Sequence, residues 1–147
     1  MRAIILASTS PYRRAQMEKL GVPFRVVAPE VNEATLAGEL GLSPRRLAER
    51  LAAAKATAKV AEAPSALWIG SDQVVDFQGR ALGKPGSPVA AVDQLLALSG
   101  QSHDLITALA VWSDGVLHTH TNVSTLTMRR LDRASLERYV QADSPWD

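Results

Sequence analysis

The sequence predicts an α/β domain with a mixed sheet, and three observations support this fold class. Short apolar runs at residues 3–7 and 67–70 each end in hydroxyl or glycine residues, which is typical of buried strands that run into loops. Three Ser-Pro pairs open segments with helical periodicity, because serine is a favourable N-cap and proline fits the first helical turn. Asp114-Gly115 separates two strand-like runs, which indicates a hairpin beside the parallel strands.

The first half of the chain predicts two strands and two helices. Each helix begins at a Ser-Pro pair and ends where glycine or proline interrupts the periodicity. In order, the elements are a strand at residues 3–7, a helix from Ser10-Pro11 to Gly21, a strand at residues 24–28, and a helix from Ser43-Pro44 to about residue 61, before Pro64. Within the first helix, Met17 and Leu20 are assigned to the apolar stripe that faces the core.

The second half predicts a further strand, two hairpins and two helices. Glycine-containing turns set the two hairpins. In order, the elements are a strand at residues 67–70, a hairpin of residues 73–77 and 80–82, a helix from Ser87-Pro88 to Gly100, a hairpin of residues 104–112 and 116–126, and a helix from Asp132 to about residue 142. No internal repeat or linker divides the chain, so residues 1–147 are expected to form a single domain.

Composition excludes several classes of protein. The chain has 147 residues, 46% of them hydrophobic, which suits one packed domain rather than a disordered chain. With 16 Lys and Arg against 15 Asp and Glu, the formal charge is +1, so no basic field would attract a long nucleic acid. The absence of cysteine excludes disulfides, thiolate metal sites and a cysteine nucleophile, and favours a cytoplasmic location. No apolar run suits a signal peptide or a membrane span, so we expect no membrane partner.

A hydroxyl-rich turn before the first predicted helix is the first candidate site. Residues 8–14 are Ser-Thr-Ser-Pro-Tyr-Arg-Arg. Arginines are unfavourable in the first turn of a helix unless an anion binds there, because the free N–H groups and the helix dipole already favour negative charge. The amides and hydroxyls of this turn, with Arg13 and Arg14, could therefore hold a phosphate chain. Alternatively, the hydroxyls only cap the helix and the arginines face solvent.

Lys55 and Asp72 are two further candidates. Lys55 lies inside an apolar helical stripe, so it either snorkels at the edge of the core or points into a site. Asp72 follows the strand at residues 67–70, and ligands bind at strand ends in α/β sheets. Its carboxylate could hold Mg²⁺ or accept a proton from water, or it could only form a turn with its own backbone. Glu33 would supply a second carboxylate if the fold brings it near.

A glycine-containing segment after the first predicted hairpin superficially resembles a P-loop. Residues 79–85 are Gly-Arg-Ala-Leu-Gly-Lys-Pro. The glycine spacing is one residue too short, and Pro85 stands where a P-loop has the Ser or Thr that binds Mg²⁺. Lys84 is therefore either a phosphate ligand in another geometry or a solvated lysine at the end of a hairpin.

The three histidines give weaker signals. His118 and His120 alternate on a predicted strand and point to one face, as metal ligands could, but the flanking threonines favour an exposed strand. His103 and Asp104 could form a base and its orienting partner. No nucleophile is placed to use that pair, so we assign no function to it.

Five motifs together resemble those of the Maf family of nucleotide pyrophosphatases, in order and spacing along the whole chain. They are residues 6–14 (LASTSPYRR), 28–33 (APEVNE), 54–56 (AKA), 69–75 (IGSDQVV) and 82–85 (LGKP). Residues 98–100 (LSG) and 137–140 (ERYV) extend the match. The resemblance implies a Maf/ITPase-like mixed twisted sheet flanked by helices. It also implies metal-dependent hydrolysis of a nucleoside triphosphate between its α and β phosphates, which gives a monophosphate and pyrophosphate.

The same resemblance implies roles for the candidate residues. Asp72 would accept a proton from the attacking water, and Glu33 would join it in holding Mg²⁺ or Mn²⁺, which takes one or two carboxylates plus substrate oxygens. The remaining candidates would bind the triphosphate and neutralise the charge that develops as pyrophosphate leaves. These residues are Ser8, Arg13, Arg14, Lys55 and Lys84.

Tyr12 and Gln73 resemble the branch of the family that hydrolyses N7-methyl-GTP. The branch that acts on dTTP and UTP usually has Arg and Thr at these two positions, and that activity is the alternative within the family. An aromatic ring can stack on a cationic methylated purine, and a glutamine amide can read the edge of a base. Tyr12 could instead only pack against the entry to its helix.

The chain departs from the family pattern at two places. Asn32 stands where the family usually has Asp, which removes a charge near the expected metal. Family chains continue beyond residues 145–147 into a C-terminal segment, so we expect this chain to lack that part of the domain. The second hypothesis is therefore a truncated, catalytically silent nucleotide-binding protein associated with septum formation. Whether two chains pair as a homodimer is left open.

Overall fold

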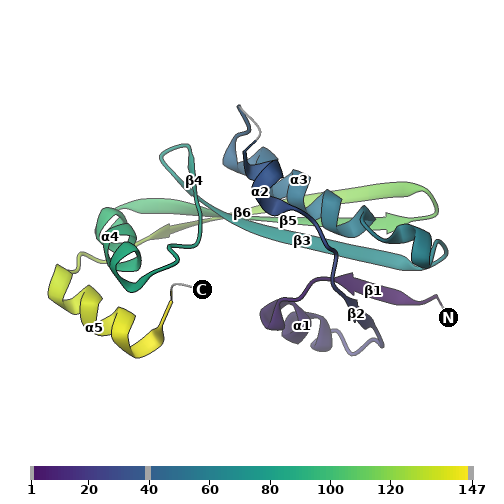
Figure 1. The fold of residues 1–147 in the computed structure, drawn as a ribbon, viewed down its shortest axis with the longest axis horizontal. Helices are drawn as coiled ribbons and strands as arrows, with labels where there is room; N and C mark the ends of the chain where they lie inside the picture. The colour runs from purple at the N-terminus through teal and green to yellow at the C-terminus, as the bar shows by residue number, and fades with distance from the viewer. Residues whose placement is uncertain (1, 39–40, 146–147) are drawn as a thin grey trace.

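The computed structural model describes residues 2–38 and 41–145, and a six-stranded sheet is its central element (Figure 1). The strands are β1 (Ile4–Ala7), β2 (Arg25–Val27), β3 (Leu67–Phe77), β4 (Arg80–Leu82), β5 (Ser102–Ser113) and β6 (Val116–Thr127). They follow the order β2-β1-β3-β5-β6, with β4 paired to β3 off this path. β1 is parallel to β2 and β3, whereas β5 is antiparallel to β3 and β6. The predicted mixed α/β class is confirmed.

Helices surround this sheet on several sides. They are α1 (Pro11–Glu18), α2 (Glu33–Ala37), α3 (Pro44–Thr57), the 3₁₀ helix η1 (Val60–Glu62), α4 (Pro88–Leu98) and α5 (Arg133–Asp143). α3 lies along β3 and β5, while α4 and α5 pack against each other at one end of the long strands (Figure 1). Among the described helices, none has the length and apolar character needed to cross a membrane.

Local capping sets the starts of the four longer helices, as the sequence predicts. The serine before each predicted helical proline accepts a hydrogen bond from the backbone N–H three residues later, which supplies a partner that this N–H lacks within the helix. The N···O distances are 3.4 Å for Ser10, 3.3 Å for Ser43 and 3.2 Å for Ser87. Asp132 caps α5 in the same way, at 2.7 Å from the Ser135 nitrogen.

Two helix predictions differ from the structure, and one helix was not predicted. α1 ends at Glu18 because the following turn tightens before Gly21, and Leu20 is 65% exposed instead of facing the core. α3 ends at Thr57, whose hydroxyl donates to the Ala53 carbonyl, and a 3₁₀ turn replaces the predicted continuation to residue 61. The short helix α2 was not predicted, because five residues carry too little periodicity.

The strands predicted at residues 67–70 and 73–77 are one continuous strand, β3. β5 pairs with it from Trp68 to Asp76 without interruption. Glycine inside a strand often marks an irregularity or a close approach of another backbone, and here the second explanation holds. A Cβ added to Gly70 would overlap the backbone of Ala52 and Ala56, and would lie 3.0 Å from the Ala56 Cα. Gly70 therefore allows α3 to cross β3 at backbone contact.

Small residues fill the space between α3 and the sheet, and two further clusters complete the core. The first cluster contains Ala48, Ala52, Ala56, Val74, Ile106, Ala108 and Ala110. A second surrounds Trp68, whose indole N–H donates to the Ala63 carbonyl at 3.0 Å. A third joins α4 to α5 through Ala91, Val92, Leu136 and Val140. The alanine stripe of α3 therefore matches the close helix–strand contact at Gly70.

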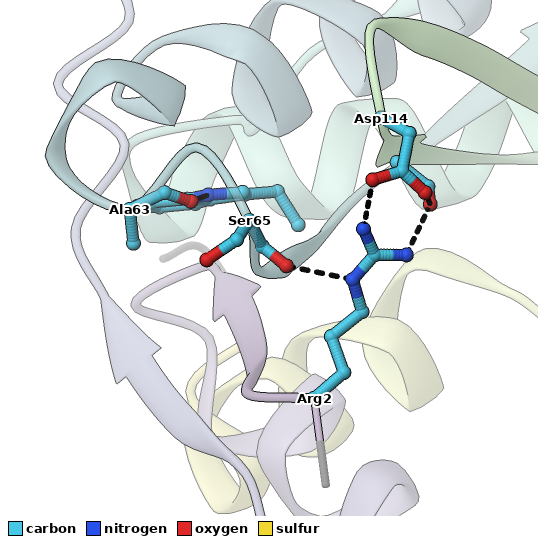
Figure 2. Close-up of polar contacts among 6 residues, drawn as sticks. Arg2, Ala63, Ser65 and Asp114 are labelled. Carbon is cyan, nitrogen blue, oxygen red and sulfur yellow. Dashed lines mark hydrogen bonds and ion pairs between the residues drawn. The ribbon is translucent and has the colours of Figure 1, made fainter.

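Arg2 ties the start of the chain to two loops on the same end of the sheet (Figure 2). Its Nε donates to the Ser65 carbonyl at 2.6 Å, and its Nη1 donates to the Ser113 hydroxyl at 2.8 Å. Its Nη2 forms an ion pair with Asp114, in the turn between β5 and β6. Arg2 also donates a hydrogen bond to the Asp114 carboxylate, and this bond lowers the pKa of Asp114 below its ordinary value of 3.8. A hydrogen bond from the Ser113 hydroxyl lowers this pKa further.

We predict that Gly70→Ala destabilises the protein. The added methyl group cannot avoid the backbone of α3, so the free energy of unfolding should fall by about 3 kcal/mol or more, at the upper end of the cost of overpacking. Urea denaturation measures the change. Gly83→Ala is the matched control, because a Cβ there has no neighbour within 4 Å, and it should change stability by less than about 0.5 kcal/mol. Equal stability of the two variants would contradict the close contact.

We also predict that Asp114 contributes to acid sensitivity. A carboxylate with a depressed folded-state pKa adds stability above its unfolded pKa, and this stability disappears as the pH falls through the folded value. The free energy of unfolding of the wild type should therefore decrease more steeply below pH 3.8 than that of Asp114→Asn. Urea unfolding at a series of pH values tests this. Arg2→Gln should flatten the profile in the same way, and parallel profiles for all three proteins would refute the contribution.

Candidate functional site

A cavity of about 750 Å³ lies where β1 ends beside the middle of β3. It collects most of the residues singled out in the sequence, from the turn before α1, from α2 and α3, from β3 and from the segment after β4. The lining residues with functional groups are Ser8, Thr9, Ser10, Tyr12, Arg13, Glu33, Lys55, Asp72, Gln73 and Lys84. The predicted candidates therefore converge, with the exception of Arg14.

The position of the cavity follows from the pairing along β3. β5 occupies one edge of this strand along nearly its whole length. The other edge pairs with β1 as far as Ile69 and with β4 from Val75 onward. Residues 70–74 therefore lack a strand partner on that edge, and Asp72 lies at the centre of the gap. The sheet leaves an opening here, which the N-terminus of α1 and the β4–α4 segment border.

The turn before α1 supplies both the predicted caps and a set of groups that face the cavity. Ser8 is buried, and its hydroxyl accepts a hydrogen bond from the Ser10 nitrogen at 3.1 Å. Arg13 Nη2 lies 3.6 Å from Asp72 Oδ1, so this arginine points inward rather than into solvent. Arg14 instead pairs with Glu18 at 3.0 Å on the outer face of α1. The structure does not bring Arg14 to the cavity, because its side chain lies on the face of α1 that carries Glu18, four residues later.

Lys55 points into the site and does not snorkel. Its side chain is only 6% exposed. The ammonium Nζ lies 2.6 Å from Asp72 Oδ1 and 2.8 Å from Glu33 Oε1, so one cation joins two carboxylates from different elements. Since a buried charge requires a partner, these contacts explain how a lysine is accommodated in the apolar stripe of α3.

Asp72 is buried in the middle of β3, so it does not form the turn that the sequence left open as an alternative. Its carboxylate lies on the face of the strand that contacts α3, the same face as Gly70 and Val74. Two cations, Lys55 and Arg13, approach the same oxygen, Oδ1. This arrangement holds a carboxylate beside a cavity, where it can accept a proton or bind a cation.

Glu33 reaches the site because α2 begins there. Asn32 caps this helix by accepting from the Thr35 nitrogen at 3.1 Å, a role that Asn and Asp fill equally well. Asn32 therefore acts in helix capping, and the carboxylate that faces Lys55 comes from the next residue. Lys59, further along the chain from Lys55, pairs with Glu30 at 2.6 Å outside the cavity, and this hydrogen bond raises the pKa of Lys59.

The cavity also contains Lys84 and has two features that sequence reasoning missed. Lys84 lines the cavity and is exposed, so its position fits both a phosphate ligand and a solvated lysine. Gln94 on α4 donates to the carbonyl of Gly83 at 3.0 Å and so fixes the segment that carries Lys84. The apolar residues Ala37, Leu47, Leu51 and Val74 also line the cavity, and Leu51 and Val74 lie next along their elements to Lys55 and Asp72. The stripe through Leu47, Leu51 and Lys55 was the available signal for part of this apolar lining.

Tyr12 and Gln73, the two residues associated with substrate choice, both line the cavity. Tyr12 is 81% exposed, so it does not pack against the entry to its helix. An exposed aromatic ring at the edge of a cavity is available to stack on a ligand. The structure therefore places both side chains where they can contact a bound molecule.

The three histidines do not line this cavity. His118 and His120 are exposed on β6, and the described residues contain no group of three or more His, Cys, Asp or Glu side chains arranged to hold a metal. Asp104 accepts a hydrogen bond from Thr125 at 2.6 Å, while the buried Nδ1 of His103 has no hydrogen-bond partner among the described residues. His103 and Asp104 therefore do not form the base and orienting pair.

Comparison with known proteins supports the resemblance. The Maf family, described as "Maf-like protein", matches residues 3–147. A protein named 7-methyl-GTP pyrophosphatase from Albidiferax ferrireducens is 44% identical over 99% of this chain and 73% of its own length. Proteins of the same name from Polaromonas sp. and Bdellovibrio bacteriovorus are 44% and 39% identical over 99% of this chain, and over 66% and 76% of their own lengths. The expectation that this chain lacks a C-terminal segment of the family is not borne out by these shares of the relatives' lengths.

The family match and the geometry of the cavity both support membership of the Maf family. The match includes nearly every described residue, and the five motifs noted in the sequence contribute side chains to one cavity. Identities near 40% along almost the entire chain extend this agreement well beyond the motifs. The chain therefore belongs to the Maf family.

Proposed function

We propose that this protein is a nucleotide pyrophosphatase that hydrolyses N7-methyl-GTP to N7-methyl-GMP and diphosphate. The observation that carries the proposal is the convergence of Arg13, Lys55, Asp72 and Glu33 in one cavity. The names of the relatives, 7-methyl-GTP pyrophosphatase, support the reaction and the substrate. A nucleotide substrate and a cysteine-free chain also favour a cytoplasmic location.

The triphosphate would bind along the cationic side of the cavity. Ser8 supplies a hydroxyl, and Tyr12 supplies an N–H in the first turn of α1, where Pro11 has none and that of Arg13 already donates to Ser10. The helix dipole favours negative charge at this end. Arg13, Lys55 and Lys84 would neutralise the phosphates and the charge that develops on the leaving pyrophosphate. Arg14 has no part in this proposal, because it pairs with Glu18 on the outer face.

Asp72 would act as the proton acceptor. A water molecule attacks the triphosphate and gives its proton to the Asp72 carboxylate, while the anhydride bond between the α and β phosphates breaks and pyrophosphate leaves. Before substrate binds, Lys55 and Arg13 hold the carboxylate at the cavity wall, which fixes its starting position. These two cations would therefore orient the base before they bind the substrate.

The carboxylates of Glu33 and Asp72 fit a divalent cation such as Mg²⁺ or Mn²⁺. Both contact a single ammonium group, and this shared cation supports the proposal that they can also share a metal ion. Hard divalent ions are commonly held by one or two carboxylates together with substrate phosphates, and this donor set matches. When bound, such an ion would neutralise phosphate charge and polarise the scissile group.

The base of the nucleotide would contact Tyr12, Gln73 and the apolar lining. An exposed tyrosine ring attracts a cationic N7-methylated purine more than a neutral base, and the Gln73 amide offers both a donor and an acceptor. These features favour N7-methyl-GTP over dTTP and UTP. The pyrimidine nucleotides remain the alternative substrates within the family.

We predict pyrophosphate release from N7-methyl-GTP in the presence of Mg²⁺, faster than from GTP, dTTP or UTP. Asp72→Asn should lower kcat by about 10² or more, the usual contribution of a positioned base. Asp76→Asn is the matched control, because Asp76 lies outside the cavity and only caps the Gly79 nitrogen at 2.8 Å. Faster release from dTTP or UTP would favour the other branch. Calorimetric binding of nucleotide without turnover would favour the catalytically silent protein.

We predict that Tyr12→Ala weakens the selection of the methylated base. The kcat/KM ratio of N7-methyl-GTP to GTP should fall by about 3- to 30-fold, the scale of a cation–π contact, while Tyr12→Trp should preserve it. Steady-state kinetics with both substrates gives this ratio. Tyr139→Ala is the control, since this other tyrosine lies on α5 and bonds to Asp143. An unchanged ratio in Tyr12→Ala would mean that the ring does not read the base.

A further inference from the structure

The two carboxylates that fit a divalent cation are already bridged by Lys55. Its Nζ lies 2.6 Å from Asp72 Oδ1 and 2.8 Å from Glu33 Oε1, and its side chain is 6% exposed. Arg13 approaches the same Asp72 oxygen at 3.6 Å. An ammonium group therefore occupies the point where the two carboxylates converge.

A divalent ion and this ammonium group cannot share these oxygens without strong repulsion. Metal–oxygen bonds of about 2.0–2.2 Å would bring the ion close to Nζ if the lysine kept both contacts. Like charges at such separations repel, and more strongly in a partly buried site than in water. Either the ion stays away, or Lys55 releases at least one carboxylate.

We infer that Lys55 and the divalent ion exchange at the carboxylates of Asp72 and Glu33. This inference rests on the proposed function. Without the ion, Lys55 holds the two acids together and keeps the buried charges paired. When the ion binds, Nζ moves from a carboxylate toward the nearest other anion, which is a phosphate of the substrate. Lys55 is thus a positioning group before substrate binds and a substrate ligand afterwards. Because it competes for the carboxylates, the site binds the divalent ion weakly until the triphosphate is present.

Mn²⁺ binding in the absence of nucleotide tests the exchange. Electron paramagnetic resonance of free Mn²⁺ reports the affinity directly and requires no turnover. Lys55→Gln should bind Mn²⁺ about tenfold more tightly than the wild type or better, because the competing positive charge is gone. An equal or weaker affinity in Lys55→Gln would overturn the exchange.

Lys59→Gln is the matched control. Lys59 is the other lysine near this end of α3 and also pairs with glutamates, Glu30 and Glu62, but it lies outside the cavity. Its replacement should leave Mn²⁺ affinity at the wild-type value. An equal gain in both variants would show a general charge effect and would also overturn the exchange.

A second measurement uses only the wild type, so it does not depend on whether Lys55→Gln folds. Saturating Mn²⁺ without nucleotide should increase the acetylation of Lys55 by acetic anhydride, with Lys59 as the internal reference in mass spectrometry. Unchanged acetylation of Lys55 would contradict its release.

A chain that hydrolyses N7-methyl-GTP but fails these tests retains the proposed function and loses only the exchange. A chain that passes them without turnover loses only the proposed function.

Discussion

The approach of α3 to β3 at Gly70 is the constraint on which the site depends. With no side chain at Gly70, the backbone of Ala52 and Ala56 rests against the strand. Lys55 lies between these alanines along the helix, and Asp72 lies two residues beyond Gly70 on the same face of the strand. The two side chains can therefore meet at 2.6 Å while both are buried. A larger residue at Gly70 would move the helix outward and separate them.

The interrupted edge of β3 supplies the space that this pair needs. β1 and β4 occupy the same edge but leave residues 70–74 without a strand partner, while β5 keeps the other edge paired. The strand stays ordered through its pairing with β5, so a gap on one side does not interrupt it. The helix N-terminus after β1 and the Lys84 segment after β4 both border the gap because each directly follows one of the two partner strands.

Sequence reasoning succeeded where neighbouring residues determine the local structure. It failed where contacts between distant segments determine the structure. The Ser-Pro caps and the Asp114-Gly115 turn were predicted because neighbouring residues determine them. The break expected at Gly70 was wrong, since the reason for that glycine is a helix that crosses from elsewhere in the chain. The pairing of Glu33 with Lys55 depends on α2, which is too short to show periodicity. Arg14 was assigned to the site although Glu18 lies four residues later, at the spacing that pairs the two side chains on one face of a helix.

The formal charge of +1 conceals an uneven distribution that only a ligand balances. The cavity gathers Arg13, Lys55 and Lys84 with a helix N-terminus, against the carboxylates of Glu33 and Asp72. Burial of Lys55 and Asp72 carries a desolvation cost that their attraction need not repay, so stability alone is a weak explanation for the pair. In the proposed function, a triphosphate would supply negative charge to these cations, and in the inferred exchange a divalent ion would replace Lys55 at the carboxylates. The charge pattern is therefore better matched to the bound state than to the empty fold.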